Sequence, residues 1–289
     1  MQTKVRQKTV KESVALDGIG LHTGFPSRMC LTPAPVGTGI VFRRSDLKHF
    51  AIPALRQYVA KVSYATSLMK QGVLIATVEH ILSAISAMGI DNLYVEVSTM
   101  ETPIGDGSAQ SFVEIIEKAG ITEQEDPRQF IRLLQPIRIE SGEKWIEAVP
   151  FDTFHIQYSI DFPHPLIRHQ EFSFSADPEG YKQDIAGART FGFVEEVQAL
   201  RQAGLARGGS LENAVVLSKD GIMNPALRYP DEFVRHKVLD LIGDLSLLGK
   251  PLLASIRAHR AGHAMHFSLC HQILKNPSCY KITFSPNGA

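Results

Sequence analysis

Alternating apolar and polar positions predict a series of short strands in each half of the chain, and stretches with helical spacing lie between them. The predicted strands span residues 10–16, 29–32, 39–43 and 92–97, and then 137–140, 144–150, 154–162 and 252–258. The predicted helices span residues 76–89, 109–119, 231–248 and 264–274. Because element order agrees between the halves, the sequence predicts an α+β fold of two similar α/β sandwich domains. Each domain is expected to be a sheet against two helices, with the helices of the two domains packed face to face.

The composition becomes polar at residues 123–129, which include Pro127, and the sequence predicts the domain boundary there. The first domain then covers residues 1–126 with a small insert at about 55–75, and the second covers residues 127–289. A larger β-α-β insert is predicted at about 190–221. Its helix carries apolar residues that either pad the core or form the wall of an apolar channel: Val194, Val197, Leu200 and Leu205.

The predicted helix at 231–248 carries ionisable residues along one narrow strip. His236 and Asp240 are four positions apart, so they project from one face, about 40° apart at about 100° per residue. Asp244 and Lys237 fall within about 100° of His236 on the same count, and apolar residues fill the opposite arc. Such a strip indicates a metal or a substrate. His236 and Asp240 alone would also be explained by an ordinary contact between positions i and i+4.

The predicted helix at 76–89 begins with Thr77 as its N-cap and ends at Gly89, a residue suited to the C′ position. Glu79 and His80 then fall in the first turn of a mostly buried helix. A buried carboxylate must be paired or functional, because an isolated charge is costly inside a protein. Two explanations stay open: a plain hydrogen bond between the two side chains, or a metal-binding His beside a carboxylate that acts on water.

Charge and composition exclude several classes of partner. The 289-residue chain has 30 Lys plus Arg and 30 Asp plus Glu, so it has no long-range field for nucleic acid or an anionic membrane. Residues 1–16 carry charges every few positions, unlike a signal peptide. The longest apolar run, 72–90, has Glu79 and His80 at its middle, which argues against a membrane span.

The cysteines point to a reducing compartment. They are odd in number and lack paired CxxC spacing, which argues against a disulfide framework or a thiolate zinc site. They are Cys30, Cys270 and Cys279. We therefore expect a cytoplasmic protein with no nucleic-acid partner and no stable membrane insertion.

A set of motifs, in order and spacing, resembles the UDP-3-O-acyl-N-acetylglucosamine deacetylase family of lipid A biosynthesis. The motifs are Thr77–His80, Asp91–Asn92, Asp106–Ser108, Ala188–Gly192, Arg235–Asp240, Gly243–Asp244 and Gly262–Ala264. Each is weak alone, but the combination is specific, and the similarity runs from about Thr9 to the last helix. The resemblance implies a two-domain α/β sandwich with one insert per domain, which agrees with the duplication predicted above.

The resemblance also implies a zinc-dependent hydrolase with named site residues. It places zinc on three residues, a donor set that leaves a coordination position for water: His80, His236 and Asp240. It makes Glu79 the general base and His263 the cationic group that stabilises the oxyanion and protonates the leaving amine. It implies further roles at Asp244, which orients His263, at Thr190, which donates a hydroxyl to the tetrahedral intermediate, and at Lys237, which binds substrate. Iron in place of zinc in the cell stays open.

The implied substrate is a UDP-sugar that carries a fatty acyl chain. The acyl chain would lie against four residues of the larger insert: Val194, Val197, Leu200 and Ala214. Asp161 and Phe162 match nucleotide contacts, and Phe191 matches a position near the sugar. Arg260 stands where the family often has lysine, and Leu68 is a further expected substrate contact.

The remaining histidines are not assigned to the metal. His22, in a glycine-rich turn, is expected to be structural, while His259 lies close enough to His263 to compete for its role. His266 and His271 lie on the last predicted helix, where surface or core roles are expected.

Two alternatives remain beside the leading hypothesis. One is a zinc deacetylase with a different amide substrate, which the apolar wall of the 190–221 insert would discriminate. The other is a non-enzymatic binding protein with a structural metal, although neither Glu79 nor His263 would be needed to hold zinc. We expect a monomer.

Overall fold

The computed structural model describes residues 5–61 and 64–285. Residues 1–4 and 286–289, at the ends of the two predicted domains, lie outside the described residues, as do residues 62–63 of the predicted first insert. In the part that is described, no helix is long and apolar enough to cross a membrane.

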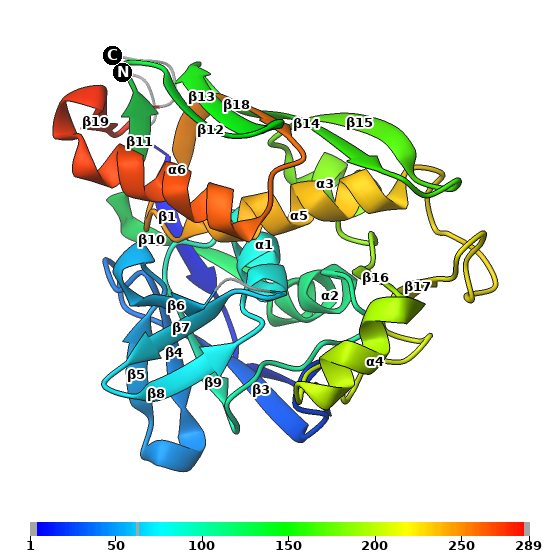
Figure 1. The fold of residues 1–289 in the computed structure, drawn as a ribbon. Helices are drawn as coiled ribbons and strands as arrows, with labels where there is room; N and C mark the ends of the chain where they lie inside the picture. Colours follow the sequence, from blue (N-terminus) through cyan, green and yellow to red (C-terminus); the bar gives the residue numbers. More distant parts are fainter. Residues whose placement is uncertain (1–4, 62–63, 286–289) are drawn as a thin grey trace.

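The first half of the chain forms a five-stranded sheet in the order β2-β3-β9-β4-β5. Its strands are β2 (Val14–Ile19), β3 (Pro26–Pro33), β4 (Ile40–Arg44), β5 (Phe50–Pro53) and β9 (Leu93–Val97). Neighbouring strands are antiparallel except for β4 and β9, which are parallel. Helices α1 (Glu79–Ala87) and α2 (Gln110–Ala119) cover one face of this sheet (Figure 1).

The second half repeats this topology around β18. The strands are β12 (Ile137–Ser141), β13 (Lys144–Pro150), β14 (Phe154–Phe162), β15 (Arg168–Ser175) and β18 (Leu252–His259). They pair in the sequence β12-β13-β18-β14-β15, again with one parallel pair, β14 and β18. The predicted duplication is therefore confirmed strand by strand. Two strands extend the sheet beyond the repeat: β11 (Phe130–Leu133) and β19 (Tyr280–Thr283).

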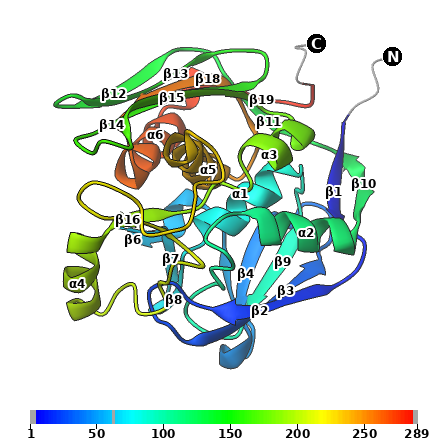
Figure 2. The same cartoon turned by 90° about the vertical axis from the view of Figure 1, so that its right-hand side faces the viewer.

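The helices of the second half are α3 (Pro178–Asp184), α5 (Glu232–Ser246) and α6 (His263–Lys275). Helices α5 and α6 lie under the second sheet and face α1 and α2, so the molecule is layered sheet, helices, helices, sheet (Figure 2). The α+β fold with helices packed face to face is as predicted. Short 3-10 helices lie at Ser45–Leu47, Arg56–Tyr58 and Pro277–Cys279.

An insert interrupts each half at the corresponding point, after the fourth strand of the repeat along the chain (β5 or β15) and before the helix at the crossing (α1 or α5). The first insert is a three-stranded sheet of β6 (Val59–Lys61), β7 (Ser67–Lys70) and β8 (Val73–Ala76). The second is a β-α-β unit of β16 (Phe191–Phe193), α4 (Val194–Gln202) and β17 (Val215–Leu217). The second insert matches the unit predicted at 190–221.

Helices α1 and α5 approach each other so closely that only glycine fits at position 243. A Cβ built on Gly243 would lie 2.1 Å from the backbone oxygen of Glu79. Because that oxygen is main chain, a side chain at 243 would force the helices apart. One hydrophobic cluster, which includes Ile81 of α1 and Leu241 of α5, runs through both halves. The crossing therefore places the start of α1 against the middle of α5.

One strand prediction was wrong, and the segment predicted as the domain boundary forms a strand. The strand predicted at 10–16 is two strands, β1 (Arg6–Val10) and β2, because Lys11 and Glu12 donate backbone hydrogen bonds to the end of α2. The polar stretch at 123–129 lies largely in β10 (Ile121–Pro127), which pairs with β1 in a two-stranded ribbon. A ribbon with exposed side chains shows little apolar alternation, so its sequence resembles a loop.

The boundaries of α1 were half right. Gly89 has φ of 73° and donates its N–H to Ser86, as expected for a residue that ends a helix. Thr77 is not the N-cap: the helix begins at Glu79, and the cap position is Val78. Thr77 has φ of 59°, and its hydroxyl donates to buried Glu101 at 2.8 Å. Because the Thr77 hydroxyl binds Glu101, it does not cap the N-terminus of α1.

Candidate metal centre and active site

One His from α1 and a His–Asp pair from α5 converge at the contact between the two helices. Asp240 Oδ1 lies 3.4 Å from Nε2 of His236 and 3.8 Å from Nε2 of His80. Candidate ligand atoms of the three residues all lie within 4.8 Å of one another. Atoms that each bind one ion at about 2.0–2.2 Å have separations of this size. The three side chains predicted as ligands are therefore brought together and could hold a metal ion.

The protonation states of these residues suit metal binding. Burial, and then the neighbouring imidazole of His236, lowers the pKa of His80 to about 3. Burial also lowers the pKa of His236. Burial opposes ionisation of Asp240, but the charges of Lys237, His236 and His263 hold its pKa below the ordinary value. Two neutral imidazoles beside one carboxylate form a donor set that binds divalent metals.

The two imidazoles differ in their outer contacts. His236 Nδ1 lies 3.0 Å from the backbone oxygen of Ala188, a contact that requires a proton on Nδ1 and leaves the Nε2 lone pair for a metal. His80 Nδ1 is buried and has no hydrogen-bond partner among the residues described. The protein therefore fixes the orientation of His236 more firmly than that of His80.

Glu79 lies next to the three candidate ligands and is almost completely buried, at 3% exposure. Its Oε2 accepts a hydrogen bond from the backbone N–H of Thr66 at 3.0 Å. Burial raises its pKa to about 8, and the carboxylates of Asp240 and Asp244 add to the rise. A carboxylate with raised proton affinity beside a metal site is suited to accept a proton from water.

His263 is the first residue of α6, and the Asp244 carboxylate of α5 stabilises its protonated form. Its Nδ1 donates to Oδ2 of Asp244 at 2.6 Å. Burial alone would lower the pKa of His263, but the Asp244 carboxylate outweighs burial and raises it to about 9. The imidazole is therefore cationic at neutral pH, and its Nε2 lies 3.9 Å from Oδ2 of Asp240. This places a proton donor beside the candidate metal ligands.

Comparison with known proteins identifies the family. The sequence pattern of the UDP-3-O-acyl N-acetylglycosamine deacetylase family matches residues 7–275. A protein from Myxococcus xanthus (strain DK1622) is 46% identical over 278 residues, which are 96% of this chain and 88% of that protein. One from Solibacter usitatus (strain Ellin6076) is 48% identical over 277 residues, 96% of this chain and 94% of that protein. Both are named UDP-3-O-acyl-N-acetylglucosamine deacetylase. The chain belongs to this deacetylase family.

A third member of the deacetylase family, from Nautilia profundicola (strain ATCC BAA-1463 / DSM 18972 / AmH), is 45% identical over 284 residues, 98% of this chain and 97% of that protein. The similarity thus spans both halves and both inserts. The resemblance expected from the motifs is confirmed.

Several residues expected near the substrate contact one another beside α5. Lys237 Nζ donates to Oδ2 of Asp240 at 2.8 Å and lies 5.5 Å from the ring centroid of Phe191. Phe191 in turn packs edge-on against Phe162, at 5.8 Å between centroids. Thr190 is half-buried one residue before Phe191, and its N–H donates to Gly107. These contacts connect the second insert to α5.

The expected nucleotide residues are paired with other side chains. Asp161 Oδ1 lies 2.9 Å from Nδ1 of His169, and its Oδ2 lies 3.4 Å from Nε2 of His259. His259 is therefore engaged with Asp161, and it is His263 that contacts Asp244. Arg260 pairs with exposed Glu143 at 2.6 Å. The exposed contacts can exchange for phosphate or ribose at little cost.

The residues expected along the acyl chain differ in exposure. Val194 is exposed, and the other three in the larger insert are half-buried: Val197, Leu200 and Ala214. No residue of α4 is fully buried, so the helix is not core padding. Leu68 is completely buried in β7, within the hydrophobic core. Its contact with substrate stays a prediction that this burial does not support.

Three residues of the site were missed from the sequence: Thr66, Tyr158 and His266. Thr66 donates its hydroxyl to Oδ1 of Asp244 at 2.7 Å, and His266 contacts the other oxygen of Asp244 at 2.8 Å. His266 follows His263 by three positions on α6, a spacing that puts both on one helix face and could have indicated a pair. Thr66 and Tyr158 belong to distant elements, and no local pattern marks them.

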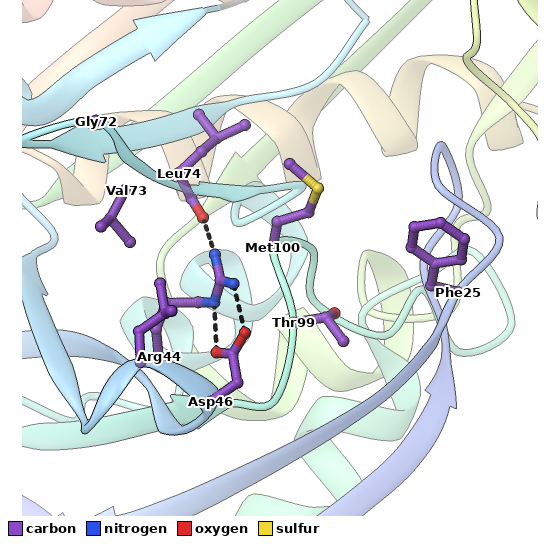
Figure 3. Close-up of a pocket in the computed structure, with 9 residues that line it drawn as sticks. Phe25, Arg44, Asp46, Gly72, Val73, Leu74, Thr99 and Met100 are labelled. Carbon is purple, nitrogen blue, oxygen red and sulfur yellow. Dashed lines mark hydrogen bonds and ion pairs between the residues drawn. The ribbon is translucent and has the colours of Figure 1, made fainter.

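Two hollows formed by the described residues lie away from the candidate ligands. Figure 3 shows one of about 350 Å³, lined by residues that include Phe25, Met100 and Arg44. Arg44 is already engaged there by Asp46 and the carbonyl of Leu74. A larger hollow of about 760 Å³ separates the halves at the C-terminal ends of α1 and α5. Neither hollow is lined by His80, His236 or Asp240.

Proposed function

We propose that this protein hydrolyses the acetamido group of a UDP-3-O-acyl-N-acetylglucosamine, releasing acetate and leaving a free amine on the sugar, in lipid A biosynthesis. The observation that carries the proposal is the convergence of His80, His236 and Asp240 beside Glu79 at the helix crossing. Family membership over almost the whole chain supports the same reaction.

Zinc is the metal that this donor set favours, with iron(II) as the competitor. Two neutral imidazoles and one carboxylate are typical of catalytic rather than structural zinc sites. When bound, the ion would lower the pKa of the attacking water and polarise the amide carbonyl. Holding that ion is the role proposed for His80, His236 and Asp240.

Glu79 is proposed as the general base. Its carboxylate receives one proton from the attacking water, and burial gives it the proton affinity to do so. The N–H of Thr66 holds one carboxylate oxygen in place, so the other is free to accept the proton. Intact Glu79 argues against a purely structural metal, which would not need a base.

His263 is proposed as the cation that balances the developing negative charge and then protonates the leaving amine from Nε2. Asp244 holds the opposite nitrogen, so the imidazolium presents only Nε2 to the reacting groups. Lys237 and the hydroxyl of Thr190 are proposed to stabilise the amide oxygen as it gains charge. The contact of Lys237 with Asp240 supports its place in this proposal.

The second insert is proposed to hold the acyl chain along Val194, Val197, Leu200 and Ala214. A chain buried there contributes about 0.8 kcal/mol per CH₂, which favours long acyl groups. Asp161, Phe162 and Arg260 are proposed to contact the nucleotide, and Phe191 the sugar. The division into domains 1–126 and 127–289, a monomeric state and a cytoplasmic location also remain proposals.

Metal analysis combined with an acetate-release assay tests the function. The protein purified with zinc should release acetate from UDP-3-O-(3-hydroxyacyl)-N-acetylglucosamine, lose that activity with a chelator and regain it with zinc. A matched substrate without the acyl chain should react far more slowly, because the binding energy of the chain is lost. Equal rates for both substrates would contradict the substrate assignment, and activity without any metal would contradict the mechanism.

A further inference from the structure

A fully buried histidine, His266, contacts Asp244, the residue that stabilises the protonated form of His263. His266, one turn along α6, is 0% exposed, and its Nδ1 lies 2.8 Å from Oδ2 of Asp244. The same oxygen accepts from His263 at 2.6 Å, and the other oxygen accepts from Thr66 at 2.7 Å. Because an ionised carboxylate only accepts hydrogen bonds, His266 must carry a proton on Nδ1. Three donors therefore hold Asp244 in one orientation.

The far side of His266 contacts a second buried polar group, Tyr158 of β14. The Tyr158 hydroxyl lies 3.2 Å from Nε2 of His266 and donates to the backbone oxygen of Ala261 at 2.7 Å. Ala261 is two residues before His263, in the turn that leads into α6. Burial raises the pKa of Tyr158 well above its ordinary value, so the hydroxyl keeps its proton.

We propose that His266 and Tyr158 are positioning residues for His263, and that they fix it from two directions. His266 holds the carboxylate that orients the His263 ring, while Tyr158 holds the backbone from which His263 projects. The inference rests on the proposed role of His263 in amide hydrolysis. It assigns a function to two buried groups whose hydrogen bonds, in the part of the chain that is described, go to Asp244, Ala261 and each other.

Packing alone does not explain these groups. A buried hydroxyl and a buried imidazole cost free energy unless they are hydrogen-bonded, and apolar residues of similar size would fill the space without that cost. This polar cluster instead specifies one geometry, because Asp244 accepts from three donors and the Tyr158 hydroxyl, which lies beside His266, donates to Ala261. His263 needs that precision, because small displacements of a proton donor are costly to the reaction.

Three substitutions at His266 separate the two contacts. In Asn the side-chain amide lies near the place of Nδ1, so His266→Asn keeps a donor for Asp244. In Gln the amide lies near the place of Nε2, so His266→Gln keeps only the contact to Tyr158. His266→Leu removes both, and Tyr158→Phe removes the hydroxyl while keeping the ring. His271→Asn, at an exposed position on α6, is the matched control.

We expect His266→Leu and His266→Gln to lower kcat by about 10–100-fold with KM and metal content unchanged, and His266→Asn to recover most of the loss. The far-downfield proton resonance of the His263–Asp244 hydrogen bond should shift in the Leu and Gln variants and stay in place in His271→Asn. Tyr158→Phe should lower kcat less, because the Asp244 contact remains.

Equal activity in the Leu, Asn and wild-type proteins would overturn the inference. So would a loss of kcat in all His266 variants that follows their thermal stability while the downfield resonance is unmoved. His263→Gln is measured beside them: if it is inactive while His266→Leu is fully active, only the positioning inference fails. If His263→Gln is itself active, the proposed role of His263 fails and the positioning inference fails with it.

Discussion

The two halves of the molecule share one topology but contribute unequally to the site. Both have five strands in the same order and a long helix at the crossing. The helix of the first half, α1, has 9 residues and contributes Glu79 and His80 from its first turn. The helix of the second half, α5, has 15 residues and contributes His236, Asp240 and Asp244 at intervals of four. The comparison teaches that two copies of one topology can form an interface while the residues at that interface differ between the copies.

The turns before the last helices show the same divergence. In the second half this turn leads to His263, which lies at the site. In the first half the equivalent turn carries Asp106, which accepts from Ser108 at 2.7 Å and from Arg228 of the other half at 2.6 Å. One turn thus connects the two halves, and the other carries the residue proposed as the proton donor.

The largest effect on kcat is expected from replacing Glu79, the proposed general base, which belongs to the first half. Glu79→Gln should lower kcat by about 10²–10⁴-fold, because the amide cannot accept the proton of water. Metal content should be unchanged, since Glu79 is not among the three candidate ligands. Acetate release and metal analysis measure both. Glu114→Gln, an exposed carboxylate on α2, is the control; equal loss of metal in Glu79→Gln would remove it as the base.

Metal binding should depend more on the second half, which supplies Asp240, than on His80 of the first half. Asp240→Ala removes the only carboxylate among the candidate ligands, and it also leaves Lys237 without its partner at 2.8 Å. We expect the metal-to-protein ratio after dialysis to fall further than in His80→Ala. Elemental analysis of both variants checks this order. Unchanged metal in Asp240→Ala would refute its assignment as a ligand.

The pH dependence of kcat/KM should report one group from each half. Glu79 must be ionised and His263 protonated, so activity rises as Glu79 loses its proton and falls as His263 loses its own. Without metal these pKa values are about 8 and about 9. A bound cation stabilises the Glu79 carboxylate and lowers its pKa, so the acidic limb of the pH profile moves to lower pH. Asp244→Asn should shift the upper limb to lower pH, because the charge that raises the pKa of His263 is gone. If the alkaline limb did not move in Asp244→Asn, that limb would report the ionisation of a group other than His263.

A smaller effect is expected on stability, at the crossing itself. Gly243→Ala should lower the free energy of unfolding by about 1–3 kcal/mol, because the new Cβ meets the Glu79 backbone oxygen. Urea unfolding measures the loss. Gly221→Ala is the matched control, since its Cβ would lie 3.7 Å from Ser218 Oγ. Equal stability of the two variants would mean that α1 and α5 can separate at little cost, despite the 2.1 Å between a Cβ built on Gly243 and the Glu79 backbone oxygen.

The smallest effect concerns the second insert. Val197→Trp should narrow the proposed acyl path and weaken long-chain substrates more than short ones, by a factor of about four for each CH₂ displaced. Kinetics with a series of acyl lengths give the measurement. Ala199→Trp places the same ring at an exposed position of α4. A uniform loss at all chain lengths would argue against the channel.

The sequence by itself determined most of the long elements and the duplication. Helical spacing put His236, Asp240 and Asp244 on one strip, and the order of the motifs indicated the family, whose resemblance implied His80 as a further candidate ligand. These features are local, or they repeat at a distance, so a linear pattern can carry them. The sequence failed where a long-range partner competed, as when Glu101 took the Thr77 hydroxyl from the end of α1.

Only the tertiary structure decided which residues surround the candidate ligands. Thr66 and Asp244 are 178 positions apart, and Tyr158 and His266 are 108 apart, yet each pair shares a hydrogen bond. Spacing along a helix fixes side-chain directions only within that helix. The partners of a buried charge come from whichever elements the core packs beside it, and that packing is a property of the whole fold.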